Sequence, residues 1–130
     1  MHSANDAKLK VLVVENEWLL RLSVLDMLED MGHEGLEAPD GGAAIRLLDD
    51  GSPVDVILID VGLPDMDGRD LARAARRLRP DLQMVFVSGH RAERLQQAAA
   101  DLTAEFLPKP YRLEDLRRTL DGMTLTATGT

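Results

Sequence analysis

The sequence predicts a doubly wound α/β fold, in which helices cover both faces of a parallel β-sheet. Three observations support this prediction. Short, continuous apolar runs, typical of strands buried on both faces, occur at 11–14, 54–59 and 84–87. Segments in which apolar residues recur at helical spacing lie between these runs. The two kinds of segment alternate along the chain, and such alternation is typical of a parallel sheet with crossover helices.

Capping and stop residues bound the first three expected helices. Apolar residues at three- and four-residue steps predict the first helix, which Gly32 ends. Asp40 caps the second helix, and Gly51 ends it. Asp67 opens a third helix, which closes before Pro80. The apolar stripe of the first helix consists of Trp18, Leu19, Leu22, Leu25 and Leu28.

Two weaker strands and two further helices complete the pattern. We expect strands at 33–38, which carries two glutamates, and at 103–107. A fourth helix is expected over 91–100, and a fifth contains Leu113, Leu116 and Leu120. The arginines of the third helix are interpreted as a solvated face, and they are Arg73, Arg76, Arg77 and Arg79.

The expected elements therefore follow the order β-α five times over. Right-handed crossovers restrict such a sheet to a few topologies, and the flavodoxin-like strand order 2-1-3-4-5 is the natural choice for five units. We expect a flavodoxin-like (βα)5 three-layer sandwich that spans residues 9–120. Residues 1–8 and 121–130 are expected to form flexible termini.

Composition argues against several classes of function. The net charge of −8 repels phosphate backbones, so we expect no binding to nucleic acid. No apolar run approaches the ~20 residues that span a bilayer, and the N-terminus lacks the apolar stretch of a secretory signal. The absence of cysteine excludes disulfides and thiolate metal sites. We expect a cytoplasmic protein that does not bind membranes.

Polar side chains lie at the ends of four expected strands. Glu15 and Asn16 follow the first strand, and Asp60 ends the third. Ser88 ends the fourth strand, and Lys109 follows the fifth. Because the carboxyl ends of parallel strands share one edge of the sheet, we expect these residues to meet. An aspartate carboxylate can attack phosphorus, and oxygen ligands suit Mg²⁺. A lysine ammonium suits a phosphate oxygen. The cluster therefore predicts phosphoryl-transfer chemistry.

Four stretches in this order closely resemble the receiver domains of two-component response regulators. They are 11–17 (VLVVENE), 57–68 (ILIDVGLPDMDG), 85–89 (VFVSG) and 106–110 (FLPKP). The resemblance covers about residues 9–120, and the combination of all four stretches, each at a strand end, is highly specific.

The resemblance implies a role for each matching side chain. Asp60 is the implied phosphoacceptor, and Lys109 would pair with the phosphoryl group. Ser88 is the implied switch hydroxyl, and Phe106 the implied switch aromatic, which would rotate inward as Ser88 moves toward the phosphate. Pro110 would follow Lys109 through a peptide bond that is usually cis in this family.

The resemblance also implies a Mg²⁺ site formed by Glu15, Asn16, Asp60 and the backbone carbonyl of Gly62. Asn16 departs from the family, which usually places aspartate at this position. A divalent ion and one carboxylate 4 Å apart attract by ~8 kcal/mol gross at an effective dielectric constant of ~20, although desolvation cancels much of this energy. We therefore expect weak Mg²⁺ binding, with Asp60 still phosphorylated at raised Mg²⁺.

The implied function is a phosphorylation-dependent signalling switch, not a turnover enzyme. A histidine kinase or histidine phosphotransfer protein would donate the phosphoryl group, and the domain would catalyse only its own phosphoryl transfer and dephosphorylation. The face made by the fourth helix, fifth strand and fifth helix would then bind a downstream protein or a second copy. We interpret the chain as a stand-alone regulator, and a fragment of a longer protein is the alternative.

Two other functions remain open. The first is a pseudo-receiver, a constitutive interaction module that is never phosphorylated. Asn16 favours this alternative, whereas the presence of Asp60, Ser88 and Lys109 argues against it. The second is an electron carrier that binds FMN on the same fold. The residues after the first strand, 15–17, form no Ser/Thr/Gly phosphate loop, which argues against this carrier.

Overall fold

A computed structural model of the chain describes residues 8–89 and 92–125. The expected three-layer sandwich is confirmed, with a parallel sheet in the order β2-β1-β3-β4-β5. The strands are β1 (Lys10–Val14), β2 (Glu34–Ala38), β3 (Val56–Asp60), β4 (Gln83–Ser88) and β5 (Glu105–Pro108). The helices are α1 (Trp18–Asp30), α2 (Gly41–Asp49), α3 (Gly68–Leu78), α4 (Ala92–Asp101) and α5 (Leu113–Asp121). Of the expected flexible termini, 1–8 and 121–130, residues 1–7 and 126–130 lie outside the described residues, and Asp121 is the last residue of α5.

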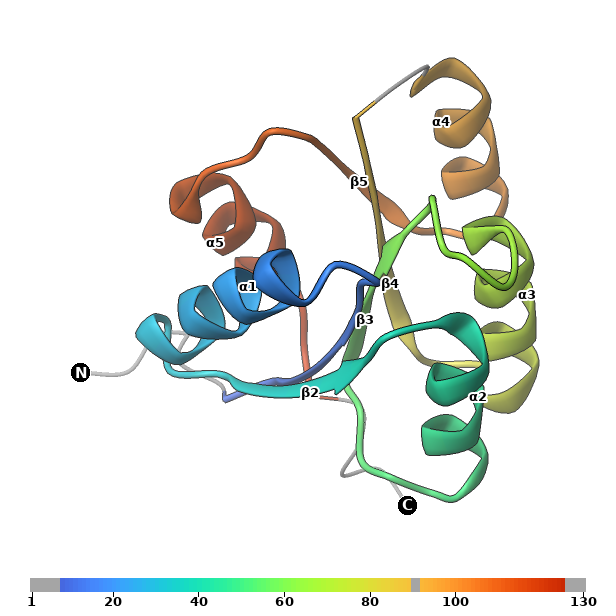
Figure 1. Ribbon diagram of the computed structural model, residues 1–130, viewed down its shortest axis with the longest axis horizontal. Coiled ribbons are helices and arrows are strands. Elements are labelled where there is room, and N and C mark those ends of the chain that lie inside the picture. Colours follow the sequence, from blue (N-terminus) through green and yellow to red (C-terminus); the bar gives the residue numbers. More distant parts are fainter. Residues whose placement is uncertain (1–7, 90–91, 126–130) are drawn as a thin grey trace.

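Helices α1 and α5 cover one face of the sheet, and α2, α3 and α4 cover the other (Figure 1). The side chains of β1 show how the strands serve both faces. Val11 and Val13 pack in the core beneath α1 and α5, whereas Leu12 and Val14 pack in the core beneath the other three helices. Because the strand side chains alternate between two buried faces, the strand must be apolar at every position.

The weakest strand prediction, at 33–38, corresponds to β2 at one edge of the sheet. It pairs with β1 alone, so one side of its backbone is open. Its glutamates, Glu34 and Glu37, are exposed, and only Ala38 at its end is buried. An edge position therefore explains how this strand tolerates charges.

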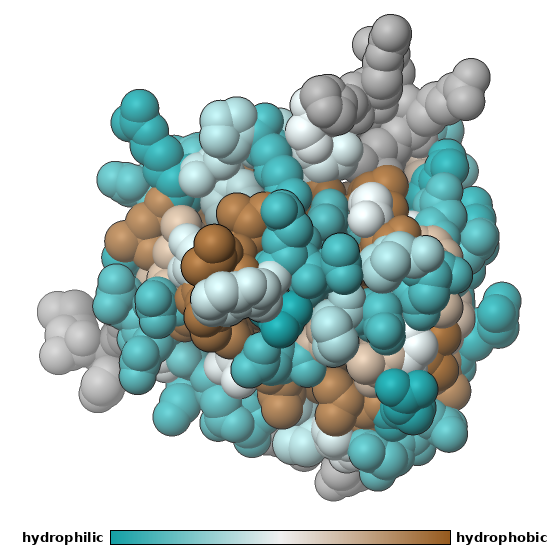
Figure 2. Space-filling model, viewed as in Figure 1, coloured by the Kyte–Doolittle hydropathy of each residue, from teal (hydrophilic) through white to brown (hydrophobic). Residues whose placement is uncertain are grey.

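Helix α1 differs from the sequence interpretation, because most of its apolar stripe is not in the core. Leu28 is buried, but Trp18, Leu19 and Leu22 are 60%, 65% and 44% exposed. A helix turns about 100° per residue, and α1 packs through Val24 and Leu28, which lie on a different side from these three residues. Figure 2 shows apolar side chains gathered on the surface over α1. Among the described residues α1, with 13 residues, is the longest helix, and no helix there is long and apolar enough to cross a membrane.

The interpretation of the α3 arginines as a solvated face is wrong for two of them. Arg76 donates hydrogen bonds to the carbonyl oxygens of Pro80 (2.9 Å), Leu82 (2.6 Å) and Leu102 (2.6 Å). Arg79 binds two carbonyl groups at the end of α2 and in the loop beyond it, at 2.9 and 2.7 Å. Both guanidinium groups therefore bind backbone carbonyls of helix ends and loops.

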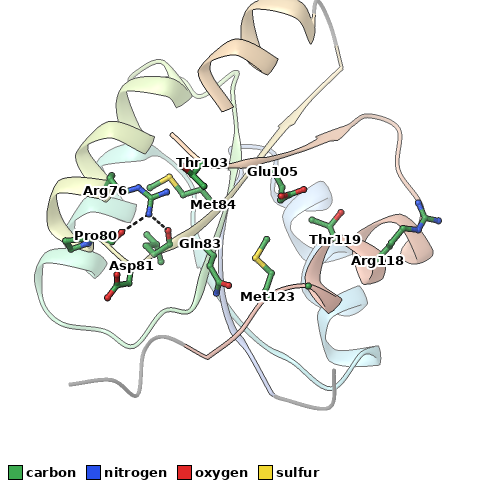
Figure 3. Close-up of a pocket in the computed structure, with 12 residues that line it drawn as sticks. Arg76, Pro80, Asp81, Gln83, Met84, Thr103, Glu105, Arg118, Thr119 and Met123 are labelled. Carbon is green, nitrogen blue, oxygen red and sulfur yellow. Dashed lines mark hydrogen bonds between the residues drawn. The ribbon is translucent and has the colours of Figure 1, made fainter. Parts of the chain in front are cut away.

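Arg76 also borders a cavity of about 710 Å³, which is lined by the start of β4 and by residues of α5 (Figure 3). This cavity lies at the amino ends of the strands, so it is separate from the carboxyl edge where the polar residues were expected to meet.

A matched pair of leucine substitutions tests the packing of β1 and α1. Leu12→Ala removes a fully buried side chain and should lower the free energy of unfolding by about 2–5 kcal/mol. Leu19→Ala removes the same atoms from an exposed site and should change it by no more than about 0.5 kcal/mol. Urea denaturation measures both, and similar losses would contradict the exposed position of the first turn of α1.

Candidate functional site

Strand register brings the ends of β1 and β3 together. Val14 pairs with Ile59, so the next residues along the two strands, Glu15 and Asp60, meet at the carboxyl edge of the sheet. The backbone N–H of Glu15 also donates to the carbonyl oxygen of Ala38 at the end of β2 (3.1 Å). Three strands therefore fix the position of Glu15.

The ends of β4 and β5 join the same edge. Asp60 pairs with Val87 in the sheet, and Ser88 pairs with Pro108. Beyond β5, the backbone N–H of Lys109 donates to the carbonyl oxygen of Ser88 (2.9 Å). The strand register therefore places Lys109, which follows the edge strand β5, close to Asp60.

One ammonium group faces two carboxylates at this edge. The Nζ atom of Lys109 lies 3.5 Å from Oε1 of Glu15 and 3.6 Å from Oδ1 of Asp60. Glu15 is buried, whereas Lys109 and Asp60 remain partly exposed. The peptide bond from Lys109 to Pro110 is cis, as the resemblance implied. Two negative groups and one positive group leave a net charge of −1, which favours the approach of a cation.

Burial is the main cause that raises the pKa of Glu15 above its ordinary value. A hydrogen bond from the backbone N–H of Glu17 (3.1 Å) lowers this pKa, and Asp60 raises it. Lys109 lowers it by a smaller amount, so the net shift is upward. The carboxylate of Glu15 is therefore held in an environment that disfavours its charge.

Tyr111 is a neighbour of the site that the sequence analysis did not identify. Burial, followed by the charges of Glu15 and Asp60, raises the pKa of Tyr111 to about 12. Its side chain helps to line a mainly apolar groove of about 470 Å³ between α1 and Lys109. The phenol is therefore protonated at neutral pH, and its place two residues after Lys109 is the sequence signal that could have identified it.

The oxygen groups at the edge fit a hard divalent cation. Glu15 and Asp60 supply carboxylates, and the exposed Asn16 directly follows Glu15. The backbone N–H of Gly62 lies 3.4 Å from Oδ1 of Asp60, so its residue borders the same carboxylate. Within the described part of the chain no group of three or more His, Cys, Asp or Glu residues could hold a metal. A cation here would therefore need amide and carbonyl oxygens in addition to the two carboxylates.

Ser88 and Phe106 lie on the neighbouring strands β4 and β5. Ser88 ends β4 and is partly buried. Phe106 pairs with Phe86 in the sheet and packs, half-buried, against the core beneath α2, α3 and α4. Both residues therefore lie on the strands between β3, which carries Asp60, and the β5 edge of the sheet, β5 included.

The two aspartates of the β3–α3 loop, Asp65 and Asp67, accept hydrogen bonds from the starts of two helices. Asp67 caps α3 by accepting a hydrogen bond from the backbone N–H of Arg69 (2.8 Å). The side chain of Arg69 also pairs with it and is the main cause that lowers the pKa of Asp67 to about 2. Asp65 accepts hydrogen bonds from two backbone amides of α2.

Gly68 allows α3 to begin close to β3. A Cβ atom at this position would lie 2.9 Å from Cα of Val61 and 3.3 Å from the carbonyl oxygen of Asp60. Any larger residue would therefore push the start of α3 away from the strand that carries Asp60.

This strand order and this polar edge define a CheY-like α/β domain. The family model of the response regulator receiver domain matches residues 11–121, and the chain belongs to this family. Its function is therefore that of a receiver domain in two-component signalling.

Curated relatives include both small and large proteins. The response regulator receiver protein CpdR of Brucella abortus is 31% identical over 119 residues, which cover 91% of this chain and 98% of CpdR. The sensor kinase CckA of the same organism is 36% identical over 115 residues, which cover 87% of this chain but only 12% of CckA. The chain is thus similar to nearly all of one relative and to a small part of the other.

Solved structures agree with the fold. The chemotaxis protein CheY4 of Vibrio cholerae superposes with a TM-score of 0.81 at 28% identity, and the match covers 89% of this chain and 98% of CheY4. A CheY-like receiver domain protein from Methanospirillum hungatei superposes with a TM-score of 0.80 at 25% identity, over 89% of this chain and 96% of that one.

Replacing Glu15 by glutamine tests the electrostatics of the edge. A carboxyl group whose pKa is raised on folding contributes stability at low pH and loses it as pH rises through the raised value. Glutamine cannot ionise, so Glu15→Gln removes the loss of stability that the parent suffers when Glu15 becomes charged. The variant should therefore be more stable than the parent at pH 7. The difference should vanish below about pH 4, where both states of the parent are protonated.

Urea denaturation at the two pH values measures this effect. Glu29→Gln, at an exposed position of α1, is the matched control and should change the free energy of unfolding by no more than about 0.5 kcal/mol. If Glu15→Gln were less stable than the parent at pH 7, attraction to Lys109 would outweigh the burial of Glu15.

Proposed function

We propose that the domain accepts a phosphoryl group on Asp60 and acts as a phosphorylation-dependent switch. The supporting observation is the position of the Lys109 ammonium, 3.6 Å from Oδ1 of Asp60. Phosphoryl transfer requires positioning and charge neutralisation more than covalent help from the protein. A carboxylate oxygen with a fixed cation beside it meets this requirement.

In the proposed reaction the donor is a phosphohistidine of a histidine kinase or histidine phosphotransfer protein. A carboxylate oxygen of Asp60 forms a bond to phosphorus as the bond from phosphorus to the imidazole nitrogen breaks, and that nitrogen keeps the electron pair. Lys109 binds a phosphoryl oxygen and offsets its charge. Water later cleaves the acyl phosphate. The domain therefore catalyses only its own phosphorylation and dephosphorylation.

Mg²⁺ is the proposed cofactor, held by Glu15, Asn16, Asp60 and the carbonyl oxygen of Gly62. When bound, it would neutralise charge that develops on the phosphoryl oxygens. Glu15, being buried, would hold its carboxylate in a fixed position beside Asp60. Because Asn16 supplies an oxygen without a charge, we expect the affinity for Mg²⁺ to be weak.

The proposed switch runs from Asp60 toward β5. A phosphoryl group on Asp60 would attract the hydroxyl of Ser88, and Phe106 on the adjacent strand would turn further into the core. Phe106 is half-buried, so such a turn would remove more of its ring from solvent. The face formed by α4, β5 and α5 would change shape and bind a downstream protein or a second copy of the domain.

A pseudo-receiver is the second candidate, and Asn16 is the observation that favours it. Direct phosphorylation separates the two candidates. After incubation with acetyl phosphate at raised Mg²⁺, the intact mass should increase by one phosphoryl group. Asp60→Asn, which keeps the shape of the side chain, should show no increase. An unmodified parent protein at every Mg²⁺ concentration would support the pseudo-receiver.

Restoring a carboxylate tests the proposed cause of weak metal binding. Asn16→Asp adds one negative charge near Glu15 and Asp60 and should tighten Mg²⁺ binding roughly tenfold or more. Asn16→Ala removes the amide oxygen and should not tighten it. Fluorescence of Trp18, the single tryptophan, reports the titration from the start of α1. Sub-millimolar Mg²⁺ binding by the parent protein would contradict the expectation.

A further inference from the structure

The loop from β3 to α3, residues 61–67, is anchored to a different part of the chain by Asp65. One carboxylate oxygen of Asp65 accepts a hydrogen bond from the N–H of Gly41 (3.0 Å), and the other accepts one from the N–H of Gly42 (2.9 Å). These are the first two residues of α2. The first amides of a helix have no partner within it and favour a negative charge, so the contacts lower the pKa of Asp65.

Helix α2 already has its own cap. Oδ1 of Asp40 accepts a hydrogen bond from the N–H of Ala43 (2.8 Å). Asp65 is therefore a second acidic partner, which comes from a loop more than 20 residues further along the chain. The next residue of the loop, Met66, packs against Gly41 so closely that a Cβ atom on Gly41 would lie 2.5 Å from the Met66 sulfur. Contact between the loop and α2 is thus close at two successive residues.

The start of α2 is joined to two segments that border the site. On one side, Ala38 ends β2 shortly before α2 and accepts the hydrogen bond from the N–H of Glu15 (3.1 Å). On the other side, the loop held by Asp65 contains Gly62, whose N–H lies 3.4 Å from Oδ1 of Asp60. The contacts of Asp65 therefore link the strand end that carries Glu15 to the loop that carries Gly62.

We propose that Asp65 is a positioning residue for phosphoryl transfer. By binding both amides, it fixes the 61–67 loop at the distance from Glu15 at which the carbonyl of Gly62 and the carboxylate of Asp60 can share one cation. This inference rests on the proposed function, and it adds a residue that touches neither the cation nor the phosphoryl group.

The test compares Asp65→Ala with Asp40→Ala, which removes a different acidic partner of the same helix. Both variants should lower the melting temperature by a few degrees, because each leaves helix amides without a carboxylate. Only Asp65→Ala should weaken Mg²⁺ binding, by roughly tenfold, as the loss of a residue that orients metal ligands commonly does. Its phosphorylation rate should fall at low Mg²⁺ and recover largely at saturating Mg²⁺.

Asp65→Asn tests whether both amide contacts are needed. Asparagine keeps one oxygen acceptor and loses the charge, so this variant should fall between the parent and Asp65→Ala. Mg²⁺ binding equal to that of the parent would show that one of the two amide contacts is dispensable, and it would overturn the inference.

The backbone amide of Gly62 gives a readout that needs no phosphorylation. In the NMR spectrum of the protein without Mg²⁺, its resonance should shift in Asp65→Ala and stay unchanged in Asp40→Ala. If the parent is phosphorylated but the two alanine variants behave alike, the inference fails while the proposed function stands. If the parent is not phosphorylated, the proposed function fails, and the Gly62 resonance alone decides whether Asp65 positions the loop.

Discussion

Two carboxylates and a single ammonium group at the carboxyl edge of the sheet are the constraint on which the site depends. Glu15 and Asp60 both lie within about 3.6 Å of the Lys109 Nζ atom, so the negative charge is not fully neutralised. Burial of Glu15 adds to the cost of this arrangement by raising the pKa of its carboxyl group. Such a cost at a polar edge is typical of a site that is arranged for a ligand and not for stability.

The sheet supplies this arrangement through ordinary packing. Every central strand is apolar on both faces, and this fixes the strands between two layers of helices. Their polar residues can then lie only at the strand ends. Parallel pairing of Val14 with Ile59 and of Ser88 with Pro108 aligns these ends, so residues 15, 60 and 109 meet although they are distant in the chain.

The features that the sequence predicted correctly follow from periodicity and topology. Continuous apolar runs identified the strands, Gly32 and Gly51 ended their helices at positive φ, and the shared edge of a parallel sheet brought Asp60 and Lys109 together. Neither the exposed face of α1 nor the carbonyl contacts of Arg76 could be predicted in this way. The exposed face of α1 depends on the rotation of the helix about its axis. The contacts of Arg76 depend on how far its long side chain reaches. No short sequence pattern encodes either property.

The contacts of Asp65 show the same limit. An aspartate in a loop between a strand and a helix is typical of a turn or a cap. The partners of Asp65, however, begin a helix that precedes it by more than 20 residues. Only the three-dimensional arrangement shows that the start of α2 is joined to both segments that border the site. Receiver domains with the same strand-end residues could therefore differ in how firmly this loop is held.

Beryllium fluoride, which mimics a phosphoryl group on a carboxylate, provides the most direct test of the common pocket. In a two-dimensional NMR spectrum with Mg²⁺ and beryllium fluoride, the backbone resonances of Gly62, Ser88 and Lys109 should shift together in the parent protein and remain unchanged in Asp60→Asn. Shifts that are absent from the parent, or that persist without the Asp60 carboxylate, would contradict the account.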